Sequence, residues 1–223
     1  MLSALLLSLT LAPAADLRAQ PAAADSAVMR EWMRIVELNG GPAVRERLLA
    51  GQDPNAIDSR GQRALHWALM HESGKVFEVL LDDPRTDPNA LNEAGEKPLW
   101  LAAMRGRLDW VQALLQRGAT LERGEPDATA RAWTTLHYAV LASHTEVLRW
   151  LLAQGGMDLN AGSINGSTPL MMALGYGSVD AAALLLKAGA DPSRRNDLGL
   201  DAWEFARRAG REDIAGRLGL KPR

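Results

Sequence analysis

One short motif recurs five times along the 223-residue chain, and its spacing constrains the fold more than any other feature. The copies are Gly61–Ala68, Gly95–Ala102, Ala132–Ala139, Gly166–Ala173 and Gly199–Ala206. Between the central residues Leu65, Leu99, Leu136, Leu170 and Trp203 the chain advances 34, 37, 34 and 33 residues. A period of this length indicates a protein assembled from stacked supersecondary units.

A second apolar run follows the motif in each unit, and Gly, Asp and Pro close most units. Leu65 and Ala68 lie three residues apart, on one face of a first helix. The matching face of a second helix is the stripe Val76, Phe77, Leu80 and Leu81. The pattern predicts a helix, a tight turn, a second helix and a loop in every unit. Because neither helix can bury both of its sides within one unit, each unit completes its core against the next.

These motifs resemble the Thr-Pro-Leu-His-x-Ala signature of the ankyrin repeat family, whose unit is about 33 residues long. The resemblance covers Ala27 to Leu218, although Arg63-Ala64 replace Thr-Pro in the first copy and Trp100 replaces His in the second. It implies an all-α solenoid of about six helix-turn-helix units with short hairpin-like turns. The implied divisions are an N-terminal capping repeat (26–59), repeats 60–93, 94–130 (with an extended loop), 131–164 and 165–197, and a C-terminal capping repeat (198–223).

The resemblance also assigns structural roles to the motif residues. In the family, the histidine of the signature bonds to loop backbone and ties adjacent repeats together. Trp67 and Trp110 fall on packing rows, so we expect them in the core. The residues predicted to be structural are Leu65, His66, Leu99, Leu136, His137, Leu170 and Trp203.

The N-terminal residues 1–19 are predicted to be a signal peptide, followed by an Ala/Pro leader at 20–25. Leu2 to Ala12 is an apolar run of the right length for a signal peptide and too short to span a bilayer. Cleavage after Ala14 or Ala19 fits the small residues there, although no basic residue precedes the run. We therefore expect export, to the periplasm of a bacterium given the excess of Arg over Lys. The alternative is a cytoplasmic protein with an apolar N-terminus.

Charge and cysteine content exclude several partners and chemistries. A net charge of −2 offers no basic field for a phosphate backbone, so nucleic acid is not expected. The absence of cysteine excludes disulfides, thiolate metal sites and a cysteine nucleophile. After signal removal no membrane span is expected, and we predict a monomer without cofactor or metal.

No group of residues has the spacing of a catalytic site. His66 and His137 lie two repeats apart, too far to share an ion, and His71 is five residues from His66, the wrong offset for one helix face. The glycines of Gly175–Gly177 end a helix rather than forming a dinucleotide loop. The sequence therefore predicts a noncatalytic scaffold that binds another protein. The alternatives are an inhibitor or immunity-type protein, an accessory factor for a periplasmic enzyme, and an unrecognised enzyme.

The binding surface is expected on the turns along one edge and on the adjoining first helices, as in the family. The turns are 58–63, 92–97, 123–134 and 164–167. The 37-residue step lengthens the third turn, through a functional insertion or through neutral length drift. We expect Trp133 and Tyr176 to anchor a partner, with Met104 and Arg105 between them. The basic stretch Arg194–Arg223, with eight basic and five acidic residues, is the alternative site. The predicted partner-binding residues are Met70, His71, Lys97, Met104, Arg105, Glu125, Asp127, Trp133, Leu141 and Tyr176.

N-terminal sequencing of the native protein tests the predicted export. We expect a mature chain that begins after Ala14 or Ala19, because small residues at these positions suit signal peptidase. An intact Met1 on protein from the soluble cytosolic fraction would contradict the prediction.

Overall fold

The computed structural model describes residues 27–121, 133–142 and 145–222, which fall into two compact units. One unit ends at Pro98 and the other begins at Leu99. The described residues form α-helices joined by turns, with one isolated antiparallel bridge between Ile57 and Arg63. The predicted signal peptide and leader lie outside the described residues.

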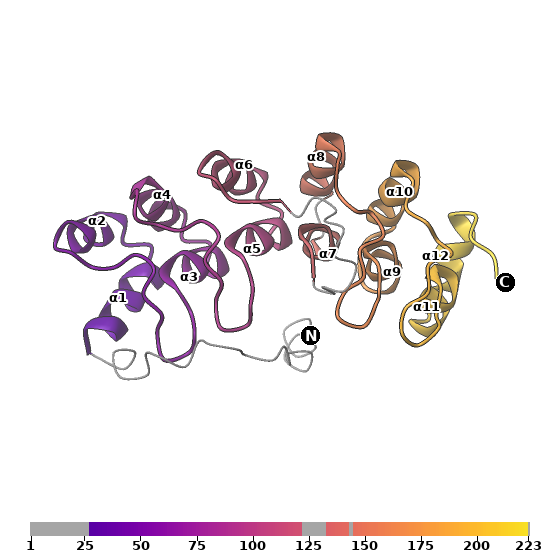
Figure 1. Ribbon diagram of the computed structural model, residues 1–223, viewed down its shortest axis with the longest axis horizontal. Helices are drawn as coiled ribbons and strands as arrows, with labels where there is room; N and C mark the ends of the chain where they lie inside the picture. The colour runs from indigo at the N-terminus through magenta and orange to yellow at the C-terminus, as the bar shows by residue number, and fades with distance from the viewer. Residues whose placement is uncertain (1–26, 122–132, 143–144, 223) are drawn as a thin grey trace. The chain divides into compact units, whose positions relative to one another are not determined.

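The first unit contains two helix pairs. They are α1 (Ala27–Glu37) with α2 (Gly41–Leu49), and α3 (Ala64–Met70) with α4 (Gly74–Asp82). α1 packs on α3 and α2 packs on α4, so the first helices form one row and the second helices another (Figure 1).

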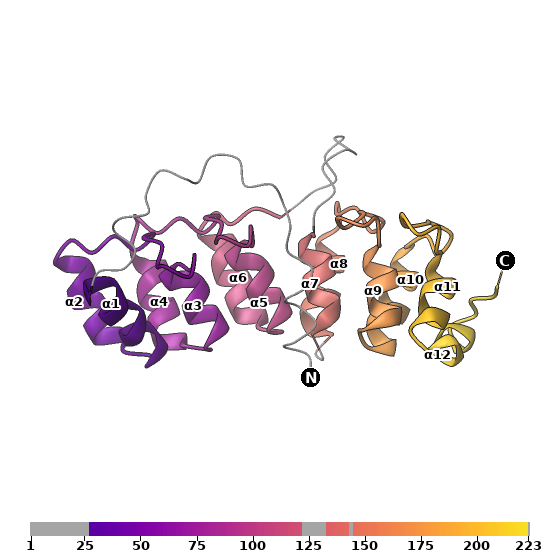
Figure 2. The same cartoon turned by 90° about the horizontal axis from the view of Figure 1, so that it is seen from below.

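The second unit contains four helix pairs, stacked in the same way. They are α5 (Pro98–Met104) with α6 (Leu108–Gln116), α7 (Thr135–Leu141) with α8 (Glu146–Gln154), α9 (Pro169–Gly175) with α10 (Val179–Ala188), and α11 (Ala202–Arg208) with α12 (Glu212–Arg217). Within this unit α7, α9 and α11 lie side by side, and α8 packs against α6 and α10 (Figure 2). The predicted all-α solenoid of helix-turn-helix units is therefore confirmed, and each predicted repeat holds one helix pair.

The core follows the apolar stripes of the sequence. The signature leucines are buried, as are the stripe residues of α4 and the alanines of the first helices: Leu65, Leu99, Leu136, Leu170, Val76, Phe77, Leu80, Leu81, Ala68, Ala102, Ala139, Ala173 and Ala206. The helix pairs approach closely, since a Cβ atom at Gly177 would lie 2.5 Å from the backbone oxygen of Val140. Glycine at this position is therefore required by the packing of α9 against α7.

Two tryptophans are more exposed than expected. Trp67 and Trp203 are half-buried, whereas Trp110 is buried as predicted. Trp203 replaces a signature leucine in the last helix pair, and the guanidinium of Arg207 lies 5.7 Å from its ring centre. The larger ring extends beyond the space that leucine fills in the other repeats, and a charged side chain covers part of it.

The helices themselves show no membrane-crossing feature. No helix in the described ranges is long and apolar enough to cross a membrane.

Substitutions at Leu136 and His137 test the idea that each repeat depends on its neighbours. Leu136→Ala should lower the free energy of unfolding by roughly 2–5 kcal/mol, through lost burial and a cavity. His137→Ala should cost less, on the order of 1–2 kcal/mol, because it leaves backbone groups without partners. Urea unfolding measures both values.

Leu49→Ala is the matched control: Leu49 is 85% exposed, so its loss should change stability by less than about 0.5 kcal/mol. A His137→Ala variant that is fully stable but defective in binding would contradict the structural role of this histidine.

Candidate functional site

The turns that precede the first helices are fixed by their own side chains. In the first unit, Asp58 Oδ1 accepts hydrogen bonds from the backbone N–H of Arg60 at 2.9 Å and of Gln62 at 2.8 Å. In the second unit, Asn196 Oδ1 accepts from the backbone N–H of Leu198 and of Leu200, both at 3.1 Å. A short polar side chain thus holds each turn in one conformation.

Adjacent turns are also bonded to one another through their backbones. The N–H of Glu93 donates to the carbonyl of Gly61 at 2.9 Å, and that of Asp197 donates to Asn165 at 3.0 Å. A Cβ atom at Gly61, where φ is +70°, would lie 2.1 Å from the Cβ of Glu93. Glycine is therefore required here for the turns to approach, and in each unit a backbone hydrogen bond holds two adjacent turns together.

The signature histidines connect a first helix to the next turn. His66 Nε2 lies 2.9 Å from the carbonyl of Glu96, and His137 Nε2 lies 3.0 Å from that of Ser167. Both rings are fully buried. Each Nε2–H donates to its carbonyl, as the family resemblance predicted.

The second nitrogens of the two histidines differ in their partners. His137 Nδ1 accepts from the backbone N–H of Thr134 at 3.1 Å and lies 2.9 Å from the Thr134 hydroxyl, which completes a capping box. The buried Nδ1 of His66 has no hydrogen-bond partner. Burial lowers the pKa of His66 to about 4. Its imidazole is therefore neutral at physiological pH, and it is buried away from any molecule bound at the surface.

Arg63 explains the missing partner of His66. It stands where Thr134 stands in the later repeat, and its guanidinium reaches away from the helix. Arg63 Nε donates to the carbonyl of Leu91 at 2.8 Å, and Nη1 donates to the carbonyl of Asn55. The first repeat thus has a bridge between two loops in place of a helix cap.

One predicted partner-binding residue of the first unit, His71, belongs to an aromatic stack that sequence reasoning missed. Met70 and Lys97 are half-buried and His71 is exposed. The ring of His71 lies 4.3 Å from that of Trp67, and the guanidinium of Arg60 lies 4.1 Å over the same indole. Asp58 Oδ2 accepts from Arg60 Nε at 3.0 Å and holds the guanidinium there. Trp67 was predicted to be in the core because its position on the first helix usually packs against the adjacent repeat. No local sequence pattern distinguishes a half-covered indole from a buried one.

Trp133 packs onto the second unit rather than projecting from it. It is half-buried, with its ring centre 5.2 Å from that of Tyr138 and 5.9 Å from that of His137. Tyr138 in turn stacks on Trp100 at 5.3 Å. Trp100 occupies the histidine position of its repeat, so an aromatic stack stands where the repeats of His66 and His137 have a hydrogen bond. The predicted loop residues Glu125 and Asp127 lie outside the described residues.

The remaining predicted residues of the second unit lie at the other end of the first helices. Tyr176 follows the last residue of α9 and is 55% exposed, whereas Trp133 precedes the first residue of α7. Met104 and Leu141 end α5 and α7 and are half-buried, and Arg105 is exposed. The expected arrangement, with Met104 and Arg105 between Trp133 and Tyr176, is therefore wrong: both residues lie at the Tyr176 end of the row.

Two exposed apolar side chains mark the turns of the second unit. Ile164 is 49% exposed and Leu198 is 65% exposed, and the Asp197–Asn165 hydrogen bond joins their turns. The first-unit turns carry Ser59, Arg60, Glu93 and Ala94 at these positions. Ile164 lay within a turn that the sequence predicted, but Leu198 was missed because its turn was assigned to the capping repeat.

No metal-binding group was found in the parts of the chain that the structure describes. In the described ranges, no three His, Asp or Glu side chains converge as metal ligands. Two of the carboxylates with a lowered pKa are instead bound to arginine: Asp109 accepts hydrogen bonds from Arg107, and Glu204 accepts from the backbone of Asp201 and pairs with Arg195. These pairs stabilise helix ends.

Comparison with protein-family models shows which family this chain belongs to. A family model described as ankyrin repeats in three copies matches residues 32–125 and 120–196. The chain belongs to the ankyrin repeat family. Ankyrin repeats mediate protein binding, and the fold is typically a noncatalytic interaction module.

Similar proteins come from distant sources. The NF-kappa-B p105 subunit of mouse is 31% identical over 163 residues, which are 70% of this chain and 16% of that protein. The human B-cell lymphoma 3 protein is 34% identical over 156 residues, 69% of this chain and 34% of that protein. The chain thus spans about a third or less of these relatives.

Solved structures share the ankyrin fold over most of the chain. The ankyrin repeat domain of Bcl-3 superposes with a TM-score of 0.64 at 29% identity, covering 83% of this chain and 81% of that one. An ankyrin repeat domain from Acinetobacter baumannii AYE superposes with a TM-score of 0.67 at 25% identity, covering 86% and 98%.

The lowered pKa of His66 predicts an acid-sensitive contribution to stability. The unfolded chain binds the proton near pH 6.5 and the folded protein only near pH 4, so the free energy of unfolding falls as the pH drops through this window. The loss should reach roughly 2–3 kcal/mol. Urea unfolding of the parent and of His66→Gln at about pH 7.5 and pH 4.5 measures it. The variant should lose less stability between the two pH values than the parent, and equal losses would contradict the assignment.

Proposed function

We propose that this chain is a noncatalytic protein-interaction scaffold that is exported to the periplasm. The observation that carries the proposal is the row of turns in each unit, which hydrogen bonds fix while their tips remain exposed. A partner that docks on such turns orders few groups, and this preorganisation lowers the entropic cost of binding.

The two units offer different chemistry along this edge. The first-unit turns are polar, with Arg60 held over Trp67 by Asp58. The second-unit turns expose Ile164 and Leu198, and the half-buried Trp133 precedes α7 in the same unit. Apolar and aromatic side chains of this kind supply most of the binding energy in protein interfaces. We therefore assign the main contact to the second unit and a polar contact to the first.

The scaffold can affect an enzyme partner in two ways. The scaffold either inhibits an enzyme or serves as its accessory factor. A pull-down from periplasmic extract with the mature chain, followed by an activity assay of the partner, separates these cases. One stoichiometric partner supports the scaffold, and a partner that loses activity identifies an inhibitor. The absence of any stoichiometric partner in this extract would contradict the proposal.

Variants of the second unit test where the partner docks. Trp133→Ala should weaken binding by ~2 kcal/mol or more, because it removes an aromatic surface at the turns. The Trp133→Ala variant loses ring contacts with Tyr138 and His137. Its free energy of unfolding should fall by only about 0.5–1.5 kcal/mol for each of these contacts. Met104→Glu should weaken binding as well. Isothermal titration with the captured partner gives the affinities.

The control for these variants is Leu49→Glu. Leu49 is more exposed than either test residue and lies in α2, away from the turns and first-helix ends, so its substitution should leave the affinity unchanged. If Trp133→Ala and Met104→Glu both bind like the parent, the contact surface lies elsewhere on the chain.

A further inference from the structure

Exposed aromatic and basic side chains gather where α9 and α11 end. Tyr176 is the only aromatic side chain among the large exposed hydrophobic residues of the described ranges. Its ring meets the half-buried ring of Phe205 edge-on, with 5.8 Å between ring centres and an interplanar angle of 88°. The α9–α11 patch, as we call it, consists of Tyr176, Phe205, Arg208 and Arg211.

The backbone beneath the patch leaves room for the Phe205 ring only because Gly175 lacks a side chain. A Cβ atom at Gly175 would lie 2.5 Å from Phe205 Cε1, so any other residue would displace the ring. Gly177 is equally constrained, because its Cβ would meet the carbonyl of Val140. The Phe205 ring is therefore packed directly against the backbone at the end of α9, and the Tyr176 ring contacts it edge-on.

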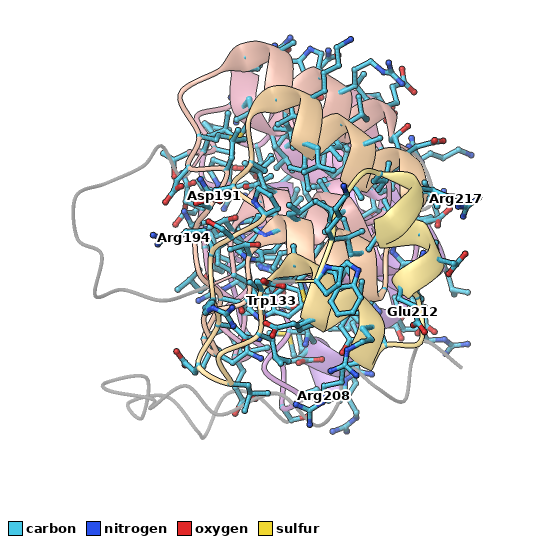
Figure 3. The ribbon with its side chains drawn as sticks, turned by 90° about the vertical axis from the view of Figure 1, so that its right-hand side faces the viewer. Trp133, Asp191, Arg194, Arg208, Glu212 and Arg217 are labelled. Atoms are coloured by element: carbon cyan, nitrogen blue, oxygen red, sulfur yellow. The ribbon has the colours of Figure 1, made fainter. Side chains whose placement is uncertain are left out.

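Two arginines lie beside the rings. Arg211 Nη1 donates a hydrogen bond to the carbonyl of Gly177 at 3.0 Å, which fixes its guanidinium next to Tyr176. Arg208 is exposed and lies three residues after Phe205, on the same face of α11. Figure 3 shows Arg208 well separated from Arg194, which lies on another side of the unit.

Basic side chains outnumber acidic ones in the stretch that carries the patch, although the exposed Glu212 follows Arg211 directly. Residues 194–223 carry eight basic and five acidic side chains. Three of those carboxylates are engaged by other arginines: Asp201 and Glu204 pair with Arg195, and Asp213 pairs with Arg217. No ion pair of Arg208 is found within the described part of the chain. A cation in the last turn also suits the dipole of α11, but that role does not involve an exposed tyrosine.

We propose that the α9–α11 patch binds an acidic segment of a partner protein that also carries an apolar side chain. The apolar side chain packs on Tyr176 and Phe205, and a carboxylate meets Arg208 and Arg211. Tyrosine and arginine are the residue types that dominate interface energetics, and opposite charge steers the segment to the patch. This inference rests on the proposed protein-binding function and names the chemistry of the bound segment.

Fluorescence anisotropy with a labelled peptide tests the inference on the full mature chain. The probe is a peptide of Glu and Asp residues around a central Leu-Phe pair. Arg208→Glu and Tyr176→Ala should each raise its dissociation constant about tenfold or more, whereas Tyr176→Phe should retain binding. Arg194→Glu is the matched control: it makes the same charge change in the same basic region but outside the patch, and should alter binding less than about twofold. A peptide with Ser in place of Leu and Phe should bind more weakly.

Three outcomes would overturn the inference. The first is an Arg194→Glu variant that weakens binding as much as Arg208→Glu, because the effect would then be general charge. The second is tighter binding of a single-stranded oligothymidylate of equal charge, which would indicate a nucleic-acid ligand. The third is no peptide binding by the parent. Thermal unfolding of each variant confirms the fold. If the pull-down partner binds the parent and the patch variants equally well, the proposed protein-binding function stands. The assignment of an acidic, partly apolar segment to the α9–α11 patch is then wrong.

Discussion

A buried histidine that reaches the carbonyl of the following turn couples one repeat to the next. His66 bonds to Glu96 in the first unit, and His137 bonds to Ser167 in the second. The imidazole spans from a first helix to a backbone that is about thirty residues away in sequence, so the position of each turn depends on the helix before it. Backbone bonds between adjacent turns then continue the same connection. Within each unit, these bonds hold the exposed turns in place.

The helices alone could not hold the turns in place. The first helices of the repeats from α3 onward have seven residues, too few to be stable as isolated helices. Their stability comes from packing, and the small residues of their inner faces allow that packing to be close. Gly175 and Gly177 illustrate the same constraint, because each is required by an atom of a neighbouring helix. A chain that stacks similar short units thus leaves its turns and helix ends available for binding.

The sequence was sufficient to predict the features that repeat and insufficient for those that occur once. The leucine positions and the helix pairs follow from a periodic pattern whose members reinforce one another, and the histidine contacts follow from the resemblance to the ankyrin repeat family. Trp133 could not be placed from the sequence, because its packing on Tyr138 depends on Trp100 replacing a histidine one repeat earlier. Leu198 was missed because its turn was assigned to the capping repeat, whereas a backbone hydrogen bond joins that turn to the one before it. Such features arise from tertiary contacts that no local pattern encodes.

Native-state hydrogen exchange of the turn amides tests the central claim most directly. The amides of Glu93 and Asp197 donate across adjacent turns, so their exchange should be slow, with opening free energies close to those of the neighbouring helices. The amide of Ser59, on an exposed turn residue, gives the reference for rapid exchange. If Glu93 and Asp197 exchange as rapidly as Ser59, the turns are not held by their neighbours, and a preorganised binding edge is contradicted.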